Sequence, residues 1–523
     1  MKHWTRLLVV ITVVFAVGTL STAFANSPEP GGTLRVGIIE DPATLDPHKT
    51  SQLTAHMVFR LLFDRLVYID ENRQPQPWLA ESWEVTDEGR VITFRLFGDT
   101  VFHDGSPLTA NSIKFTYDRL LDSETASPTR SLMVGSLEAI EVVDPLTVRF
   151  RFAEPFAPFF LNLYSGYMGI LPEGIDQQTF GRNPIGSGPF MFERWDVGSQ
   201  VVLKSNPDYQ THREDLENRR APYVSEIVFR VVPEEGTRIA ALETGELDIV
   251  PVPLEDAARL ETDPSVRIVA WEEATNYLAV EFNPNKPPFD SQAMRRAIGF
   301  AIDPEEIVLG AWSGYAMVNA NPVGVGHAGY APDVAAEYGF TFDPEQAIAL
   351  LEGEGWTLGN DGVRRKDGEP LRVLMTLSGN PAYVRAAQII QAQLSDVGVA
   401  VDLEVVDAGA FTDLLRGGDQ NFNLQRWNWV DPVLMSFVYL DGGIVGIYDI
   451  ERLDPVLRAA DAAVVWEERE PILREAQKIL LEEGALVPIL TEYVMVAVSD
   501  GVEGYRWDAL GYEVWNDIWL DAR

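Results

Sequence analysis

The chain has 523 residues, of which 46% are hydrophobic and 10% aromatic, so we expect two or three packed lobes rather than one core. Its formal net charge of −38 at pH 7 excludes nucleic-acid binding, which needs clustered Lys and Arg. Because the chain has no cysteine, disulfides, thiolate metal sites and cysteine nucleophiles are excluded as well.

The N-terminal segment is typical of a secretory signal peptide. Lys2 and Arg6 precede a nearly unbroken apolar run over residues 7–20, and Ala23-Phe24-Ala25 fits the small-residue cleavage pattern. A membrane anchor is the alternative, but this run is shorter than the roughly 20 residues that span a bilayer. We therefore expect a signal peptide at residues 1–25 and a mature protein that is free in the periplasm. Without a cysteine to carry a lipid, it is expected to be neither a lipoprotein nor embedded in the membrane.

After a Pro/Gly-rich start, the mature chain predicts a short strand, a loop and an amphipathic helix. Residues 32–38 fit a strand, and the Thr-Leu-Asp-Pro-His run at residues 44–48 fits a loop. Apolar residues at helical spacing then predict a helix within residues 58–66. A proline-containing step at residues 76–83 leads into the next strand.

Residues 91–121 predict a strand, a tight turn and a capped helix in succession. Apolar and polar side chains mostly alternate over residues 91–97, which is typical of a half-buried strand. Asp, Gly, Ser and Pro gather in residues 102–107, where Gly105 is free to take a positive φ. Thr109 is a good N-cap for the apolar residues that recur at helical spacing behind it.

Beyond this motif, helices and strands alternate between proline-rich joints, which predicts α/β lobes. An aromatic-rich stretch at residues 156–170, interrupted by Pro and Gly, predicts a loop with a short helix. The predicted strands lie at residues 227–233, 248–250, 278–283, 398–401, 422–429 and 486–490, and the predicted helices at residues 238–247, 289–302, 343–351 and 383–394.

Several of these segments resemble one protein family. Residues 94–110 are similar to the signature of the family 5 extracytoplasmic solute-binding proteins, the dipeptide and oligopeptide receptors of bacterial ABC importers. Residues 183–190 and 206–209 match further turns of the family, and the resemblance runs from about residue 32 to about residue 490. The chain departs from the signature at Asn111 and Ser112, where the family has acidic residues.

The resemblance implies an α/β fold of two lobes, the type II, cluster C periplasmic-binding-protein fold, with an additional third domain. Lobe I would then be built from residues 27–70, 183–282 and 496–523. The extra domain II would span residues 71–182, and lobe III would span residues 283–495.

An enzyme is the competing class of protein, and the chain lacks common enzyme signatures. No G-x-S-x-G elbow, H-E-x-x-H motif or P-loop occurs. The six histidines include no i, i+4 pair with zinc-ligand spacing, and no catalytic residue, metal ligand or cofactor is predicted. A His103-Asp104 dyad is conceivable, but a structural turn explains both residues more simply. A secreted hydrolase is the alternative, and turnover on peptide or glycoside libraries would identify it.

The resemblance implies a periplasmic receptor that captures a small molecule or peptide and delivers it to an inner-membrane ABC permease. Two lobes would close over the ligand about a hinge, and no bond would be broken. Peptides are the leading ligand class because most of the family takes them, and oligosaccharides are the alternative. The receptor is expected to be a monomer.

The candidate ligand site is the segment 422–432, which begins as a strand and breaks at its final proline. Trp427 and Trp429 are one residue apart and so point the same way on a strand, with Asn428 and Asp431 beside them. Both tryptophans could instead be core residues. The segment matches the place where the family has "G-W-x-x-D-Y-x-D-P", and in peptide receptors an aspartate there pairs with the α-ammonium of the ligand.

Two questions stay open at this site. The chain is shorter than the family pattern, so Asp431 could match either the ligand-binding aspartate or the structural Asp-Pro position. The Trp-Asn-Trp run would also suit sugar rings, through stacking and directed hydrogen bonds. Asn276 and Tyr277 precede the strand at residue 278, where the lobe crossover of the family lies, and we expect them on the facing side of the same cleft.

Overall fold

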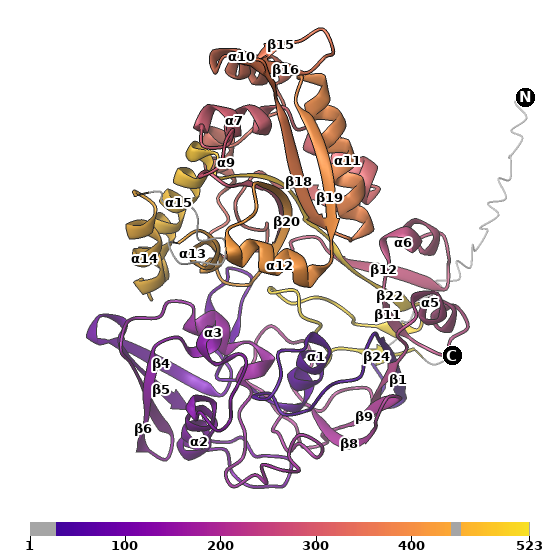
Figure 1. Cartoon of the computed structure of the whole chain (residues 1–523). Coiled ribbons are helices and arrows are strands. Elements are labelled where there is room, and N and C mark those ends of the chain that lie inside the picture. Colours follow the sequence, from indigo (N-terminus) through magenta and orange to yellow (C-terminus); the bar gives the residue numbers. More distant parts are fainter. Residues whose placement is uncertain (1–27, 441–450, 522–523) are drawn as a thin grey trace, which may run out of the picture.

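The computed structural model describes residues 28–440 and 451–521. The expected signal peptide, residues 1–25, lies outside the described residues. The described chain forms three larger sheets, which we use to name its parts: lobe I for the seven-stranded sheet, domain II for the four-stranded sheet and lobe III for the six-stranded sheet. Figure 1 shows lobe III as the upper body, with domain II and lobe I side by side beneath it.

Lobe I has the strand order β12-β22-β11-β1-β10-β9-β8. β1 runs parallel to β10 and β11, whereas β22 lies antiparallel between β11 and β12. The strands are β1 (Thr33–Ile38), β8 (Phe190–Asp196), β9 (Gln200–Ser205), β10 (Glu226–Val231), β11 (Ile249–Pro251), β12 (Val266–Trp271) and β22 (Val494–Ser499), with the pair β23 (Val502–Glu503) and β24 (Trp519–Leu520) after them. The helices are α1 (Leu53–Leu62), α5 (Glu235–Glu243) and α6 (Leu254–Leu260).

Domain II is an antiparallel sheet of order β4-β5-β7-β6. Ile92 and Phe94 of β5 are fully buried while Arg95 is exposed, so the predicted alternation of this strand is confirmed. Its elements are β4 (Ala80–Thr86), β5 (Val91–Leu96), β6 (Leu137–Asp144), β7 (Thr147–Phe152), α2 (Ala110–Leu121), α3 (Arg130–Val134) and α4 (Phe159–Leu163), with the short pair β2 (Val67–Ile69) and β3 (Pro75–Pro77) and the 3₁₀ turns η1 (Asp87–Gly89) and η2 (Gly166–Met168) around them.

The predicted turn and cap of the 91–121 motif are confirmed. Gly105 takes φ +83°, which a side chain would strain. The Thr109 hydroxyl accepts a hydrogen bond from the Asn111 amide at 3.3 Å, and the Ser112 hydroxyl accepts one from the Thr109 amide at 3.3 Å. Ser112 therefore completes a capping box without the acidic residue of the family signature.

Lobe III has the strand order β14-β21-β13-β20-β18-β19. The strands are β13 (Asn276–Phe282), β14 (Ala316–Val318), β18 (Arg372–Ser378), β19 (Ala400–Val406), β20 (Phe422–Asn428) and β21 (Leu486–Glu492), with the small sheet β15 (Thr357–Leu358), β16 (Arg364–Lys366) and β17 (Glu369–Pro370). The helices are α7 (Gln292–Phe300), α8 (Pro304–Trp312), α9 (Pro332–Tyr338), α10 (Pro344–Gly353), α11 (Pro381–Asp396), α12 (Ala408–Gly417), α13 (Leu434–Tyr439), α14 (Asp454–Ala462) and α15 (Trp466–Glu483).

Lobe I and domain II share one hydrophobic core, in which Leu34 of β1 and Phe94 of β5 belong to the same cluster. Lobe III has its own two main clusters, one around Phe282 and Ile298 and the other around Tyr277. The lower body is therefore packed as a single unit against which lobe III stands as a second one.

The chain crosses between lobe I and lobe III at two short neighbouring segments. Residues 272–275 join β12 to β13, and the single residue Tyr493 joins β21 to β22. We expected lobe I to extend to residue 282, but β13 pairs with β20 and β21 in the sheet of lobe III. The sheets therefore change before residue 276, because the hydrogen-bond partners of residues 276–282 all belong to lobe III.

Candidate functional site

The predicted site residues lie beside the crossing, at the first residues of β13 and the last of β20. These strands are antiparallel neighbours in which Asn276 is paired with Asn428 and Tyr277 with Trp427. The two pairs stand side by side in one sheet of lobe III, rather than across a cleft from each other. Since directly opposed residues project to the same face, Tyr277 and Trp427 share one face of the sheet.

Glu281 of β13 projects from the same face of the sheet and is fully buried. Its carboxylate accepts hydrogen bonds from Trp427 Nε1 at 2.8 Å, Tyr439 Oη at 2.9 Å and Asn423 Nδ2 at 3.3 Å. The influences on this carboxylate within the described chain are its burial and these three hydrogen bonds, with no charged partner among them. Burial therefore raises the pKa of Glu281, and the three donors offset part of that rise.

Asn276 joins the two crossing segments through its side-chain amide. Its Nδ2 donates to the Glu492 carbonyl at 3.0 Å, and its Oδ1 accepts from the Glu492 amide at 2.8 Å. The Thr491 hydroxyl also donates to the Asn276 carbonyl at 2.9 Å. Asn276 is 1% exposed, and its side-chain amide holds the end of β21 against the start of β13.

Asp431 is fully buried and forms a bidentate ion pair with Arg469 of α15. The Nη–O distances are 2.8 and 2.6 Å, and Arg469 Nε also donates to the Ala460 carbonyl at 3.0 Å. One carboxylate oxygen of Asp431 accepts from the Val433 amide at 2.7 Å, which caps the turn after β20. This arrangement favours the structural Asp-Pro position over the ligand-binding position that the sequence had left open.

Asn428 and Trp429 are the two predicted residues that keep free surface. Asn428 is exposed, and its Oδ1 accepts from the Thr275 hydroxyl at 3.0 Å. Trp429 is half-buried and packs against both the core shared by lobe I and domain II and the Tyr277 cluster of lobe III. Its Nε1 has no hydrogen-bond partner within the described chain, so a donor is held at the junction of the two bodies.

Two further hydrogen bonds join lobe III to the lower body. Arg73, between β2 and β3, donates from Nε to the Gly326 carbonyl of lobe III at 2.8 Å. On the domain II side, the Ala157 amide donates to the Asp461 carbonyl at 2.9 Å. Burial raises the pKa of Asp461 to about 7, with the hydrogen bond from Ser436 acting against it. The described structure is therefore a conformation in which lobe III touches the lower body.

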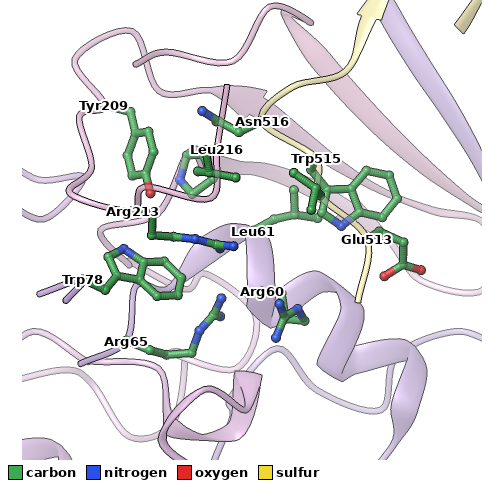
Figure 2. Close-up of a pocket in the computed structure, with 12 residues that line it drawn as sticks. Arg60, Leu61, Arg65, Trp78, Tyr209, Arg213, Leu216, Glu513, Trp515 and Asn516 are labelled. Carbon is green, nitrogen blue, oxygen red and sulfur yellow. The ribbon is translucent and has the colours of Figure 1, made fainter. Parts of the chain in front are cut away.

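Two cavities are present in the lower body, and none of the six predicted residues lines either of them. The larger, of about 460 Å³, is an open hollow between Lys49 and helix α2. The smaller, of about 30 Å³, lies between the end of α1, Trp78, Arg213 and residues 513–516. Figure 2 shows the side chains of Arg65 and Arg213 extending toward the space between the lining residues, with Arg60 beside them.

Sequence analysis missed Glu281 and Arg469. The signal for Glu281 was present, because it is the one charged residue in the otherwise apolar run Leu278-Ala279-Val280-Glu281-Phe282. A charge in the middle of a buried strand needs polar partners, which points to the neighbouring strand. Arg469 carried no such signal, since α15 has many charged residues and the partner lies 38 positions away.

Across residues 28–440 and 451–521 no cluster of three or more His, Asp or Glu side chains could hold a metal ion. The same part of the chain contains no helix that is both long and apolar enough to cross a membrane.

The fold and the sequence together define the class of protein. Residues 74–444 match the model of the bacterial extracellular solute-binding proteins, family 5, middle region. The chain belongs to this family, and its fold is the expected two-lobed α/β architecture with an additional domain.

The individual relatives are distant but cover nearly the whole chain. A probable D,D-dipeptide-binding periplasmic protein, DdpA of Escherichia coli, is 26% identical over 95% of this chain and 96% of its own. Heme-binding protein A of Haemophilus influenzae is 24% identical over 88% of this chain and 87% of its own. The structure of HbpA2 from Haemophilus parasuis superposes with a TM-score of 0.81 at 23% identity, covering 94% of this chain and 100% of that one. These relatives are binding proteins rather than enzymes, so the chain is a solute-binding protein.

Proposed function

We propose that this solute-binding protein is the periplasmic receptor of an ABC importer, which captures its ligand by hinge closure and delivers it to an inner-membrane permease. The observation that carries the proposal is the pair of short crossings at residues 272–275 and Tyr493. Two packed bodies joined by so few residues can rotate about them while each keeps its own core. Closure would bury the ligand between lobe III and the lower body.

Peptides are the ligand class that we propose first, and oligosaccharides second. A D,D-dipeptide-binding relative at 26% identity supports peptides. The heme-binding relative at 24% identity argues that family membership alone leaves the ligand open. Trp429, with a flat face at the junction of the two bodies, supports either class, because such a ring can pack on an apolar side chain or a sugar ring.

We propose that Trp427, Asn428, Trp429, Asp431, Asn276 and Tyr277 form the lobe III wall of the ligand site. Asn428 and Trp429 would contact the ligand, because they alone keep free surface or an unpaired donor. The other four would hold them in place through Glu281, Glu492 and Arg469. A peptide α-ammonium would reach Asp431 only if the Arg469 ion pair opened.

The receptor proposal is tested with protein purified without denaturation. Native mass spectrometry identifies any ligand that co-purifies, and calorimetry then measures its affinity. Binding should lower the radius of gyration in X-ray scattering and raise the melting temperature by mass action. If a tightly bound ligand moves neither quantity, the hinge proposal fails. If the ligand is chemically changed during incubation, the secreted hydrolase becomes the better description.

The site proposal is tested by two substitutions measured with the cognate ligand. Trp429→Ala should weaken binding by more than ten-fold, and Trp429→Phe, which keeps a ring but loses the indole N–H, should weaken it less. Asp431→Asn should weaken peptides more than neutral sugars if the ammonium contact forms. Unchanged affinity in both Trp429→Ala and Asp431→Asn would remove these residues from the site.

We further propose that residues 1–25 are a signal peptide cleaved after Ala25, and that the mature protein is a periplasmic monomer. The basic, apolar and small-residue segments in that order support cleavage. Intact-mass measurement of the exported protein should give a chain that begins at Asn26, and a mass that retains residues 1–25 would contradict it. We also propose that lobe I, domain II and lobe III are the structural units of the chain in its motion. The boundary between lobe I and lobe III then lies at residues 272–275.

A further inference from the structure

The small cavity of lobe I and domain II is surrounded by buried arginines. Arg60 lies in the last turn of α1, Arg65 follows three residues after the helix ends, and Arg213 enters from the loop before β10. They are 6%, 1% and 7% exposed, so bulk water cannot solvate their charges as it does at the surface. The cavity wall is completed by Trp78 and by the C-terminal residues 513–516.

Two of these arginines have carboxylate partners and one does not. Arg60 pairs with Asp508 at 3.0 Å, and Arg213 pairs with Asp215 at 2.5 Å. Arg65 forms no ion pair within the described residues; its Nη1 donates to the Phe63 carbonyl at 3.1 Å, and its guanidinium lies over the Trp78 ring at 4.4 Å. A buried cation without a counter-charge is costly, so this position calls for a negative charge.

Asp64, next to Arg65 in the chain, and Glu513, on the cavity wall, supply only part of that charge because each is partly protonated at neutral pH. Burial raises the pKa of Asp64 to about 7, and the hydrogen bond from Tyr209 at 3.0 Å only partly offsets it. Burial also raises the pKa of Glu513, on the opposite wall, to about 7. Burial and the charge of Arg60 lower the pKa of Arg65 only to about 9, so the guanidinium stays protonated at neutral pH.

The unpaired polar atoms around the cavity are mostly donors. Four N–H groups on its lining residues have no partner: Nε of Arg60, Nε of Arg65 and the indole N–H groups of Trp78 and Trp515. The one unpaired acceptor there is Oδ1 of Asn516. A water molecule would need acceptors for its own two hydrogens, whereas an anion only accepts. The excess of donors therefore favours an anion.

We propose that this cavity is a binding site for a chloride ion. Its volume of about 30 Å³ is enough for one small ion, because a single water needs about 10–15 Å³ of such space. A chloride would neutralise Arg65 and accept from the surrounding N–H groups. It would thereby bind α1, the start of domain II and the C-terminal segment together, and this role does not depend on which solute the protein carries.

The first test compares salts at constant sodium concentration and ionic strength. This match is needed because the net charge of −38 makes any salt stabilising by screening. Chloride and bromide should raise the melting temperature above the value in gluconate, saturably and on the order of 2 °C or more. Arg65→Met should lose this halide-specific increment. Arg372→Met, which removes an exposed arginine paired with Asp402, should retain it.

The second test is crystallographic and uses the wild-type protein, so it stands even if Arg65→Met fails to fold. Crystals soaked in sodium bromide should give an anomalous peak in the cavity, within hydrogen-bonding distance of Arg65. Trp78→Phe, which removes one donor and keeps the ring, should weaken the bromide occupancy. An empty or water-filled cavity at high bromide, or equal melting temperatures in chloride and gluconate, would overturn the proposal.

Discussion

Replacing Arg469 by methionine should destabilise the protein strongly. The substitution keeps the length of the side chain but removes the partner of Asp431, whose carboxylate is fully buried. Removal of one member of such a buried pair costs about 3–5 kcal/mol in the free energy of unfolding. The hydrogen bond from the Val433 amide remains, which places the expected loss toward the lower end.

We therefore expect a loss of about 3–4 kcal/mol at pH 7. Adding Asp431→Asn to Arg469→Met should recover most of this loss, because no buried charge is then left without a partner.

Urea denaturation at pH 7, followed by circular dichroism, measures these losses. Arg372→Met is the control, since its partner Asp402 is about half exposed and such surface pairs contribute about 0–1 kcal/mol. A loss below about 1 kcal/mol, or one that the added Asp431→Asn substitution does not reverse, would show that the Asp431–Arg469 pair does not hold the end of β20.

Three further predictions concern the scaffold. Burial raises the pKa of Asp64 to about 7, so the folded state binds this proton more tightly than the unfolded state does. The free energy of unfolding should therefore fall from pH 4 to pH 7, by at most about 4 kcal/mol from this group. Asp64→Asn should flatten that fall in a pH series of urea unfolding curves. Thr109→Ala should cost about 0.5–2 kcal/mol through the lost cap of α2, whereas Thr109→Ser should cost little; equal losses in the two variants would exclude capping as the cause. Asn276→Ala should cost about 1–3 kcal/mol because the amide and carbonyl of Glu492 lose their partner, and urea unfolding that matches the wild type would show that the two crossings are not held by this side chain.

The elements that depend on neighbouring residues could be predicted from the sequence. The strand, turn and capped helix of residues 91–121 follow from alternation, from Gly105 and from Thr109, all of which act within a few positions. The family and its fold followed from the same local motifs. The pairing of β13 with β20 could not be predicted this way, because it joins residues about 150 positions apart through backbone hydrogen bonds that any sequence can make.

The candidate site was predicted only in part for the same reason. The tryptophans and their neighbours are close in the sequence, so the segment was found. The burial of Tyr277 beside Glu281 and the ion pair of Asp431 depend on Tyr439 and Arg469, which reach the site through tertiary packing. The local sequence pattern therefore located the segment but could not show which of its side chains face outward.

The position of β22 constrains how the lobe I sheet can be completed. Every strand of the lobe III sheet comes from residues 276–492, so that sheet can form from one continuous stretch of chain. The lobe I sheet is incomplete until β22, among the last thirty residues, enters between β11 and β12. Closing a loop of this length in an unstructured chain costs entropy that grows with its logarithm. A folded lobe III has already paired Leu278 with Leu490, so the two ends of that loop are adjacent. Lobe III is therefore the natural first unit to fold, and its completion brings together the strands from which lobe I is assembled.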